Sequence, residues 1–190
     1  MPWVDAEYAG ELAVVAAWLA ALVPWSVSLQ PNAPFGSIYF AVRWPLWELQ
    51  VRLPATVDGD PEPVVEALGQ VYPGVRLFWD FYLADPLSAA TFYDSGLLSA
   101  AGTAWVAGAV VVLVAVLLGI ALYYDEAGVA DRLPVDHVRL MAALLGLATV
   151  AFTAATALYW LGPAFVGLPI PVGVVVVGAL AVALARVERV

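Results

Sequence analysis

The chain contains no cysteine and no lysine, and these two absences narrow the chemistry that is open to it. Without cysteine there are no disulfides, thiolate metal sites or cysteine nucleophiles. Without lysine there is neither a retinal Schiff base nor the phosphate-binding lysine of a P-loop. Every basic residue is therefore an arginine: Arg43, Arg52, Arg76, Arg132, Arg139, Arg186 and Arg189.

Positive charge is scarce as well, with 7 basic residues against 16 acidic ones and a net charge of -9. Nucleic acids and anionic lipid surfaces are bound through basic patches, so neither nucleic acid binding nor polybasic adsorption to lipid is predicted. Acidic, lysine-free loops are typical of proteins adapted to concentrated salt. A GC-rich gene would deplete lysine too, so both explanations stay open.

Hydrophobic residues, in contrast, make up 64% of the chain, against roughly 45 to 50% in soluble domains. The mean hydropathy is +0.91. Four apolar stretches are long enough to cross about 30 Å of hydrocarbon as helices. The sequence therefore predicts a mainly α membrane protein with a bundle of four transmembrane helices: residues 8–27, 100–124, 138–161 and 168–185.

The arginines predict the orientation of this bundle. Arg132 and Arg139 flank a short loop at residues 125–137, and Arg186 and Arg189 follow the fourth helix. Arginines in short loops remain on the cytoplasmic side, so both termini are predicted to be cytoplasmic in a multi-pass cell membrane protein. Aromatic belts are then expected at the outer helix ends (Trp25, Trp105, Tyr159, Trp160) and the inner ends (Tyr8, Tyr123, Tyr124).

Small residues and one proline refine the first helix. Ala13, Ala17 and Ala21 recur at a spacing that lets helix backbones approach closely, which predicts a compact bundle. Pro24 cannot donate a backbone hydrogen bond, so we expect a kink or an early end of the helix there. The acidic leader before the helix differs from a signal peptide, whose leader is basic.

Residues 28–96 are predicted to form an extracytoplasmic α+β insertion of ββαβ order between helices 1 and 2. We expect strands at about 37–44, 47–53 and 75–82, and a helix at about 61–72. A turn at Pro45-Leu46 would pair Arg43 with Glu48 in a hairpin. Because Pro-Leu does not suit a tight primed turn, a bulge or longer turn that shifts these pairs is the alternative.

The two faces of this hairpin differ in character. One face carries the Arg43–Glu48 pair and Tyr39 opposite Arg52, a cation–π arrangement. The other face is entirely apolar. A stripe of Val64, Leu68 and Val71 on the predicted helix would make that face a core; left uncovered, it would be a partner-binding site. The candidate partner-binding residues are Ile38, Phe40, Val42, Trp44, Trp47, Leu49, Val51, Leu53 and Trp79.

Polar groups inside the predicted helices are few. Glu11 lies about one turn into the first helix, where we expect a solvated carboxylate rather than a proton site. Thr149, Thr153 and Thr156 are expected to bond to helix carbonyls or across helices. None of these positions predicts catalysis.

The loop before the third helix contains the single histidine, His137, together with several acidic residues: Asp125, Glu126, Asp131 and Asp136. Carboxylates bind hard cations, but the spacing fits no EF-hand, so we expect a solvated acidic loop in which Asp136 starts the helix. No catalytic residue, metal site or cofactor is predicted, and the chain is not expected to be an enzyme.

The opening EYAGELAVVAAWLAALVPWSVS, the four-span layout and the acidic, lysine-free loops resemble uncharacterised four-helix membrane proteins of halophilic archaea. That resemblance implies no known activity and no residue roles. We predict an accessory or scaffold subunit that uses its extracytoplasmic cap or its bundle to bind a membrane protein, an extracytoplasmic protein or a second copy. The alternative is an oligomeric channel or carrier for a small solute or ion, lined by the threonines of the third helix.

Overall fold

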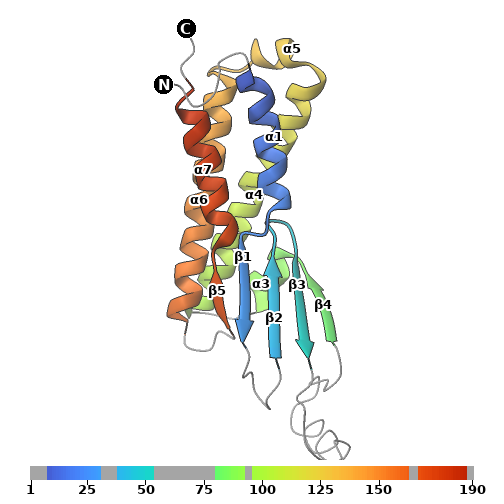
Figure 1. Ribbon diagram of the computed structural model, residues 1–190, viewed down its shortest axis with the longest axis vertical. Coiled ribbons are helices and arrows are strands. Elements are labelled where there is room, and N and C mark those ends of the chain that lie inside the picture. Colours follow the sequence, from blue (N-terminus) through green and yellow to red (C-terminus); the bar gives the residue numbers. More distant parts are fainter. Residues whose placement is uncertain (1–7, 31–37, 54–79, 93–95, 163–166, 188–190) are drawn as a thin grey trace, which may run out of the picture.

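The computed structural model describes residues 8–30, 38–53, 80–92, 96–162 and 167–187. In these ranges the chain is mainly helical with one antiparallel sheet (Figure 1). The helices are α1 (Ala9–Leu22), α3 (Pro86–Phe92), α4 (Gly96–Tyr124), α5 (Glu126–Ala130), α6 (His137–Leu161) and α7 (Val172–Ala185). The strands are β1 (Ser26–Gln30), β2 (Ile38–Arg43), β3 (Glu48–Leu53), β4 (Asp80–Ala84) and β5 (Leu168–Ile170).

Helices α1, α4, α6 and α7 form a bundle, in which α1 packs through small side chains (Figure 1). The buried residues of α1 are all alanines: Ala9, Ala13, Ala16, Ala17 and Ala20. A side-chain carbon built at Gly119 of α4 would lie 3.4 Å from Cβ of Ala17 and 3.8 Å from Cα of Val14, so little more than a methyl group fits between the two helices there. The predicted packing through small residues is confirmed for this helix pair.

Only α4 and α6 of the described helices are both long enough and apolar enough to cross a membrane, with 29 and 25 residues. α1 and α7 are apolar but have 14 residues each. The predicted helices at 8–27 and 168–185 are therefore too long at one end. Pro24 ends α1 early, and Pro169 and Pro171 hold the chain extended until α7 begins.

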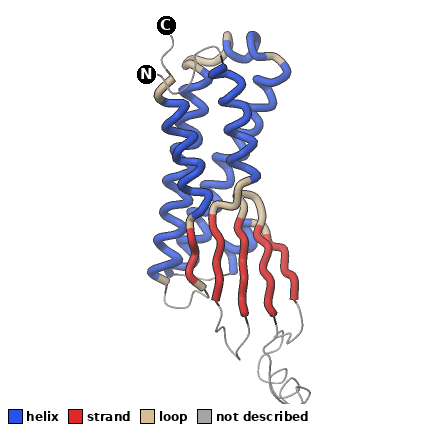
Figure 2. The backbone as a smooth tube through the Cα atoms, viewed as in Figure 1, coloured by secondary structure: helices blue, strands red, loops and turns tan. Residues whose placement is uncertain are grey.

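The segment that follows α1 and the segment that precedes α7 are strands of the sheet, whose strand order is β4-β3-β2-β1-β5 (Figure 2). The predicted hairpin is confirmed: β2 pairs with β3 from Ile38↔Leu53 to Arg43↔Glu48, in the expected register. β4 begins at Asp80 and pairs with β3, so the third strand agrees with the prediction at its C-terminal part. The helix predicted at 61–72 lies outside the described residues.

β1 and β5 were not predicted, and they change the architecture. β1 pairs with β2 on one side and with β5 on the other, so the sheet recruits strands from the end of the first helix and the start of the fourth. The sheet is therefore not confined to an insertion between helices 1 and 2. In Figure 1 it continues below α1 and α7, beside the lower halves of α4 and α6.

Aromatic rings fill the junction between bundle and sheet. Trp25 stacks on Phe152 with ring centroids 5.3 Å apart and on Tyr159 at 6.5 Å, and it contacts Trp105 at 5.7 Å. Trp25, Trp105 and Tyr159 are buried, so the prediction that they form an outer belt is wrong. The belt prediction overlooked that the sheet covers this end of the helices.

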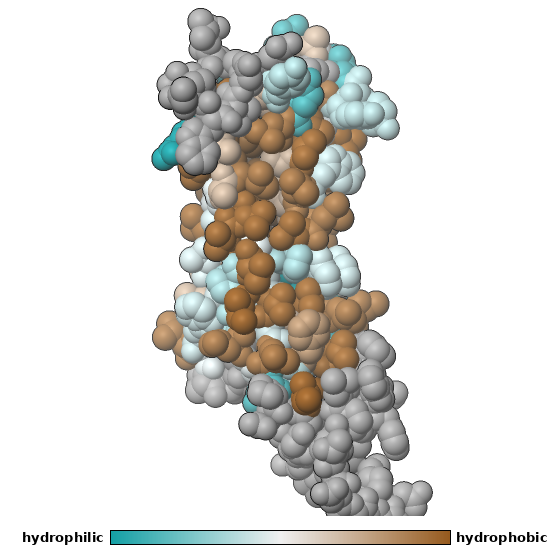
Figure 3. Space-filling model, viewed as in Figure 1, coloured by the Kyte–Doolittle hydropathy of each residue, from teal (hydrophilic) through white to brown (hydrophobic). Residues whose placement is uncertain are grey.

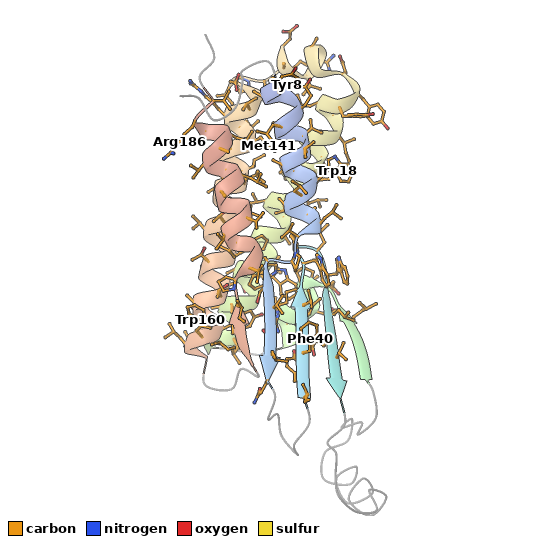
Figure 4. The ribbon with its side chains drawn as sticks, viewed as in Figure 1. Tyr8, Trp18, Phe40, Met141, Trp160 and Arg186 are labelled. Atoms are coloured by element: carbon orange, nitrogen blue, oxygen red, sulfur yellow. The ribbon has the colours of Figure 1, made fainter. Side chains whose placement is uncertain are left out.

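The other predicted belt residues are exposed. Trp160 lies at the sheet end of α6 and Tyr8 at the opposite end of the bundle, as Figure 4 shows. Tyr123 and Tyr124, at the end of α4, are also exposed. α1 begins and α7 ends at the same end of the molecule as α5, opposite the sheet (Figure 1).

Candidate functional site: the two faces of the hairpin

The hairpin formed by β2 and β3 packs its polar side toward the helices. Along β2, Tyr39, Ala41 and Arg43 are buried, whereas Ile38 is exposed and the side chains between them are half-buried. Glu48 of β3 is buried together with its partner Arg43. We call the side with Tyr39, Ala41, Arg43 and Glu48 the inward face, and the opposite side the outward face.

An ion pair lies at the turn end of the inward face. Arg43 Nη2 is 2.8 Å from Glu48 Oε1, and each side chain is only 3% exposed. Arg43 Nη1 also donates a hydrogen bond to Ser28 Oγ at 2.7 Å, and the guanidinium lies 5.4 Å from the ring centroid of Tyr159. One arginine thereby connects β1, β2, β3 and α6. The predicted Arg43–Glu48 pair is confirmed; the side chain of Arg52 lies outside the described residues, so its contact with Tyr39 stays a prediction.

The contacts of Arg43 and Glu48 offset the cost of burying two charges. They do not create a reactive group. A buried charge needs a partner and hydrogen bonds, because desolvation costs several kcal/mol per ion. Arg43 and Glu48 meet that requirement for each other, with Ser28 accepting from the guanidinium. In the described part of the chain, four buried side-chain atoms form no hydrogen bond: Trp25 Nε1, Ser26 Oγ, Gln30 Oε1 and Glu48 Oε1, the last of which contacts Arg43 as an ion pair. The inward face is thus a fixed polar joint between sheet and helices.

The tip of the hairpin is a tight turn made by Trp44, Pro45, Leu46 and Trp47. The Trp44 amide donates to the Trp47 carbonyl at 2.8 Å, and the two indole rings stack with centroids 3.8 Å apart and planes 5° from parallel. Pro45 is buried, and its carbonyl accepts a hydrogen bond from Trp105 Nε1 of α4 at 2.9 Å. The turn therefore lies at Pro45-Leu46 as predicted, without the bulge that was the alternative.

The outward face brings together most of the residues predicted to bind a partner. Ile38 and Trp47 are exposed, and the others on this face are half-buried: Phe40, Val42, Trp44, Leu49 and Val51. Apolar residues cover the helices and reappear below a paler band that separates the two regions (Figure 3). The Leu53 side chain and Trp79 lie outside the described residues, as do Val64, Leu68 and Val71 of the predicted covering helix.

A second site lies at the opposite end of the bundle and was not predicted. A groove of about 380 Å³ between α1 and α4 is lined by Glu11, Trp18, Tyr123 and His137, among apolar residues. Glu11 is exposed, in agreement with the prediction of a solvated carboxylate. His137 is only 6% exposed, so the prediction that it belongs to a solvated loop is wrong. Glu11 and His137 are far apart in the sequence, and no pattern in the sequence indicated that they line the same groove.

Asp136 explains part of this placement. Its Oδ1 accepts from the amides of Val138 at 2.9 Å and Arg139 at 3.0 Å, so it caps α6 as predicted. His137 is then the first residue of the helix and turns into the bundle. Among the described residues, no three histidine, aspartate or glutamate side chains lie close enough to hold a metal ion.

The threonines of α6 use their hydroxyl protons within their own helix. Thr149 donates to the Leu145 carbonyl at 2.8 Å, Thr153 to the Thr149 carbonyl at 2.7 Å, and Thr156 to the Phe152 carbonyl at 2.8 Å. These bonds match the expected back-bonding to helix carbonyls.

Residues 2–189 match a family of unknown function, DUF7549, and the chain belongs to that family. No curated protein and no solved structure shows significant similarity to it. The family match covers the helices and the sheet together, and it assigns no activity to either.

Proposed function

We propose that this member of the family is a multi-pass membrane protein without catalytic activity that binds a partner protein through the outward face of its hairpin. The observation that carries the proposal is the orientation of the sheet. Its charged side packs against the helices and its apolar side faces away from them. The partner is a membrane or extracytoplasmic protein, or a second copy of the chain.

The physical reason is the cost of apolar surface in water. An antiparallel sheet with one covered face normally covers its apolar side, because burial contributes about 25 cal/mol per Å² of apolar surface. A large uncovered apolar patch is typical of a surface that another molecule covers. A hairpin that encloses a paired arginine and glutamate instead leaves its apolar side available for such a contact.

The helices support placement in a membrane. Side chains such as Val110, Leu117, Val150 and Val175 are apolar and exposed around the bundle. Water would disfavour that surface, whereas lipid chains solvate it. Arg132, Arg139 and Arg186 belong to the end that contains α5, so arginine placement favours a cytoplasmic position for that end and an extracytoplasmic position for the sheet.

The bonding of the threonines favours the docking role over the channel alternative. A pore needs polar groups directed at the permeating solute. The hydroxyl protons of Thr149, Thr153 and Thr156 are instead donated to backbone carbonyls of α6. The inward ion pair offers no free acid or base either, because Arg43 and Glu48 bind each other.

Photo-crosslinking in native membranes tests the docking role. Benzoylphenylalanine would replace Phe40 on the outward face and, as a matched control, Leu117 on the exposed side of α4. We expect Phe40 to yield one protein adduct, identified by mass spectrometry, while Leu117 yields lipid adducts. Val42→Asp should abolish the Phe40 adduct without unfolding the protein.

The same experiment can contradict the proposal. Identical adducts from Phe40 and Leu117, or a Phe40 adduct that survives Val42→Asp, would remove the docking role. An adduct joining two copies of the chain would support docking and identify a homo-oligomer. Extraction of membranes with alkaline carbonate checks the other half of the proposal, because release of the protein would exclude integral insertion.

A further inference from the structure

We propose that the turn formed by Trp44, Pro45, Leu46 and Trp47 inserts into the headgroup region of the bilayer beside the end of α1. This inference rests on the proposed membrane placement and adds a second contact with lipid, made by the sheet. The ligand is the interface of the bilayer itself.

The chemistry of the turn fits that environment. Leu46 and Trp47 are 40% and 41% exposed at the tip, and Trp44 stacks against Trp47 to form one broad aromatic plate. Tryptophan is enriched where hydrocarbon meets headgroups, because its ring is apolar and its N–H is polar. A leucine between two tryptophans supplies further apolar surface.

Part of the backbone of the turn, and the two charges that flank it, already have partners inside the protein. The Trp44 amide donates to the Trp47 carbonyl, and the Pro45 carbonyl accepts from Trp105. Arg43 and Glu48, the charged residues on either side, face inward and pair with each other. The main cost of placing a loop in lipid is the transfer of unpaired charges and unpaired backbone groups. Insertion of the tip exposes to lipid neither an unpaired charge nor the backbone groups named above.

The depth of the turn follows from its neighbours. Pro45 binds Trp105, Trp105 contacts Trp25, and Trp25 lies three residues after the end of α1 at Leu22. Figure 1 shows the β2–β3 connection next to the end of α1. The tip thus lies at the level where the chain leaves α1 and enters β1.

The length of α1 places that level roughly 9 Å or less from the edge of the hydrocarbon. α1 and α7 have 14 residues each. Each therefore extends about 21 Å, less than the roughly 30 Å of a bilayer core. If α1 lies in the membrane, its last residues, including the exposed Leu19 and Leu22, are still in lipid. A turn at the same level is then within reach of the headgroups.

The absence of cysteine makes a direct measurement practical. Leu46→Cys would be labelled with a nitroxide in the full chain, reconstituted in vesicles of phosphatidylcholine and phosphatidylglycerol. Collision with oxygen, which concentrates in lipid, and with a nickel chelate, which stays in water, would be compared by electron paramagnetic resonance. Leu117→Cys on α4 and Val135→Cys before α6, which are similarly exposed, serve as lipid and water references.

We expect the oxygen-to-nickel collision ratio at residue 46 to fall between those of residues 117 and 135. A ratio at residue 46 equal to that at residue 135, with residue 117 in lipid, would overturn this inference and leave the membrane placement standing. Water-like ratios at all three sites would overturn both. Trp47→Cys repeats the measurement at the tip if Leu46→Cys does not fold.

Discussion

The inward and outward faces of the hairpin share one backbone and differ in what covers them. The inward face holds the Arg43–Glu48 ion pair, with the Tyr159 ring of α6 beside the guanidinium. The outward face carries valine, leucine, phenylalanine and isoleucine, and much of it stays accessible. The difference teaches that a charge pair, rather than apolar character, marks the face of this sheet that packs against the helices.

The largest expected effect comes from removing one member of the ion pair. Glu48→Ala leaves the Arg43 guanidinium buried without its counter-ion, so we expect a loss of about 3 to 5 kcal/mol in the free energy of unfolding. Denaturant unfolding of the protein in detergent measures it. The double variant Arg43→Met with Glu48→Met should recover most of the loss. A single variant no worse than the double one would show that the charges are not effectively buried.

A smaller effect is expected at the tip of the inward side. Trp105→Phe removes the donor to the buried Pro45 carbonyl, which should cost about 1 to 3 kcal/mol. Trp160→Phe is the matched control, because Trp160 Nε1 donates to the Pro169 carbonyl at 2.8 Å while Trp160 is 54% exposed. Thermal unfolding should give Trp105→Phe a lower midpoint temperature than Trp160→Phe; the reverse order would contradict a buried Pro45 carbonyl.

Substitutions on the outward face should lower the free energy of unfolding less than substitutions on the inward face. Val42→Ser is expected to change the free energy of unfolding by less than about 1 kcal/mol, because Val42 is only half-buried. Its strand neighbour Ala41 is fully buried, and Ala41→Val should cost about 1 to 3 kcal/mol through overpacking. Parallel unfolding curves compare the two. Equal losses would mean that the outward face is itself a core.

The smallest effect is expected at a site that belongs to neither face. The Ser88 hydroxyl, followed by the Ser88 amide, donates to the Asp85 carboxylate and holds its pKa below the ordinary value of 3.8. A lowered pKa in the folded state stabilises the start of α3 above that ordinary value, and this contribution disappears as the pH falls through the lowered pKa. The protection factors of residues 87–92 against hydrogen exchange, corrected for the intrinsic rate at each pH, should fall in acid, and Asp85→Asn should remove that dependence.

The sequence was sufficient for features determined by neighbouring residues or by regular alternation. Apolar residues at every second position, with Arg43 opposite Glu48, predicted the register of β2 and β3. The spacing of the alanines in α1 predicted close packing of this helix, although Ala21 is only half-buried. Both patterns repeat over several residues, and each repeat reinforces the same alignment.

Features that depend on distant partners were missed. Leu168–Ile170 has three residues, too few for an alternation, and becomes a strand only because β1 lies beside it. Trp25 and Trp105 have the composition of a membrane belt and are buried because the sheet covers the ends of α4 and α6. His137 enters a groove whose other side comes from α1. Hydropathy along one segment does not report such neighbours.

The pairing of β1 with β5 also constrains the order in which the protein can assemble. Val27 lies opposite Ile170, so the two strands come from nearly opposite ends of the chain. During synthesis the sheet from β1 to β4 can form while the free edge of β1 waits for β5 to emerge. Until then its unpaired backbone groups could join a strand of another chain. Closure of this edge is therefore a late folding step, and a ribosome-bound chain stopped before residue 168 should be more prone to aggregate than the full-length protein.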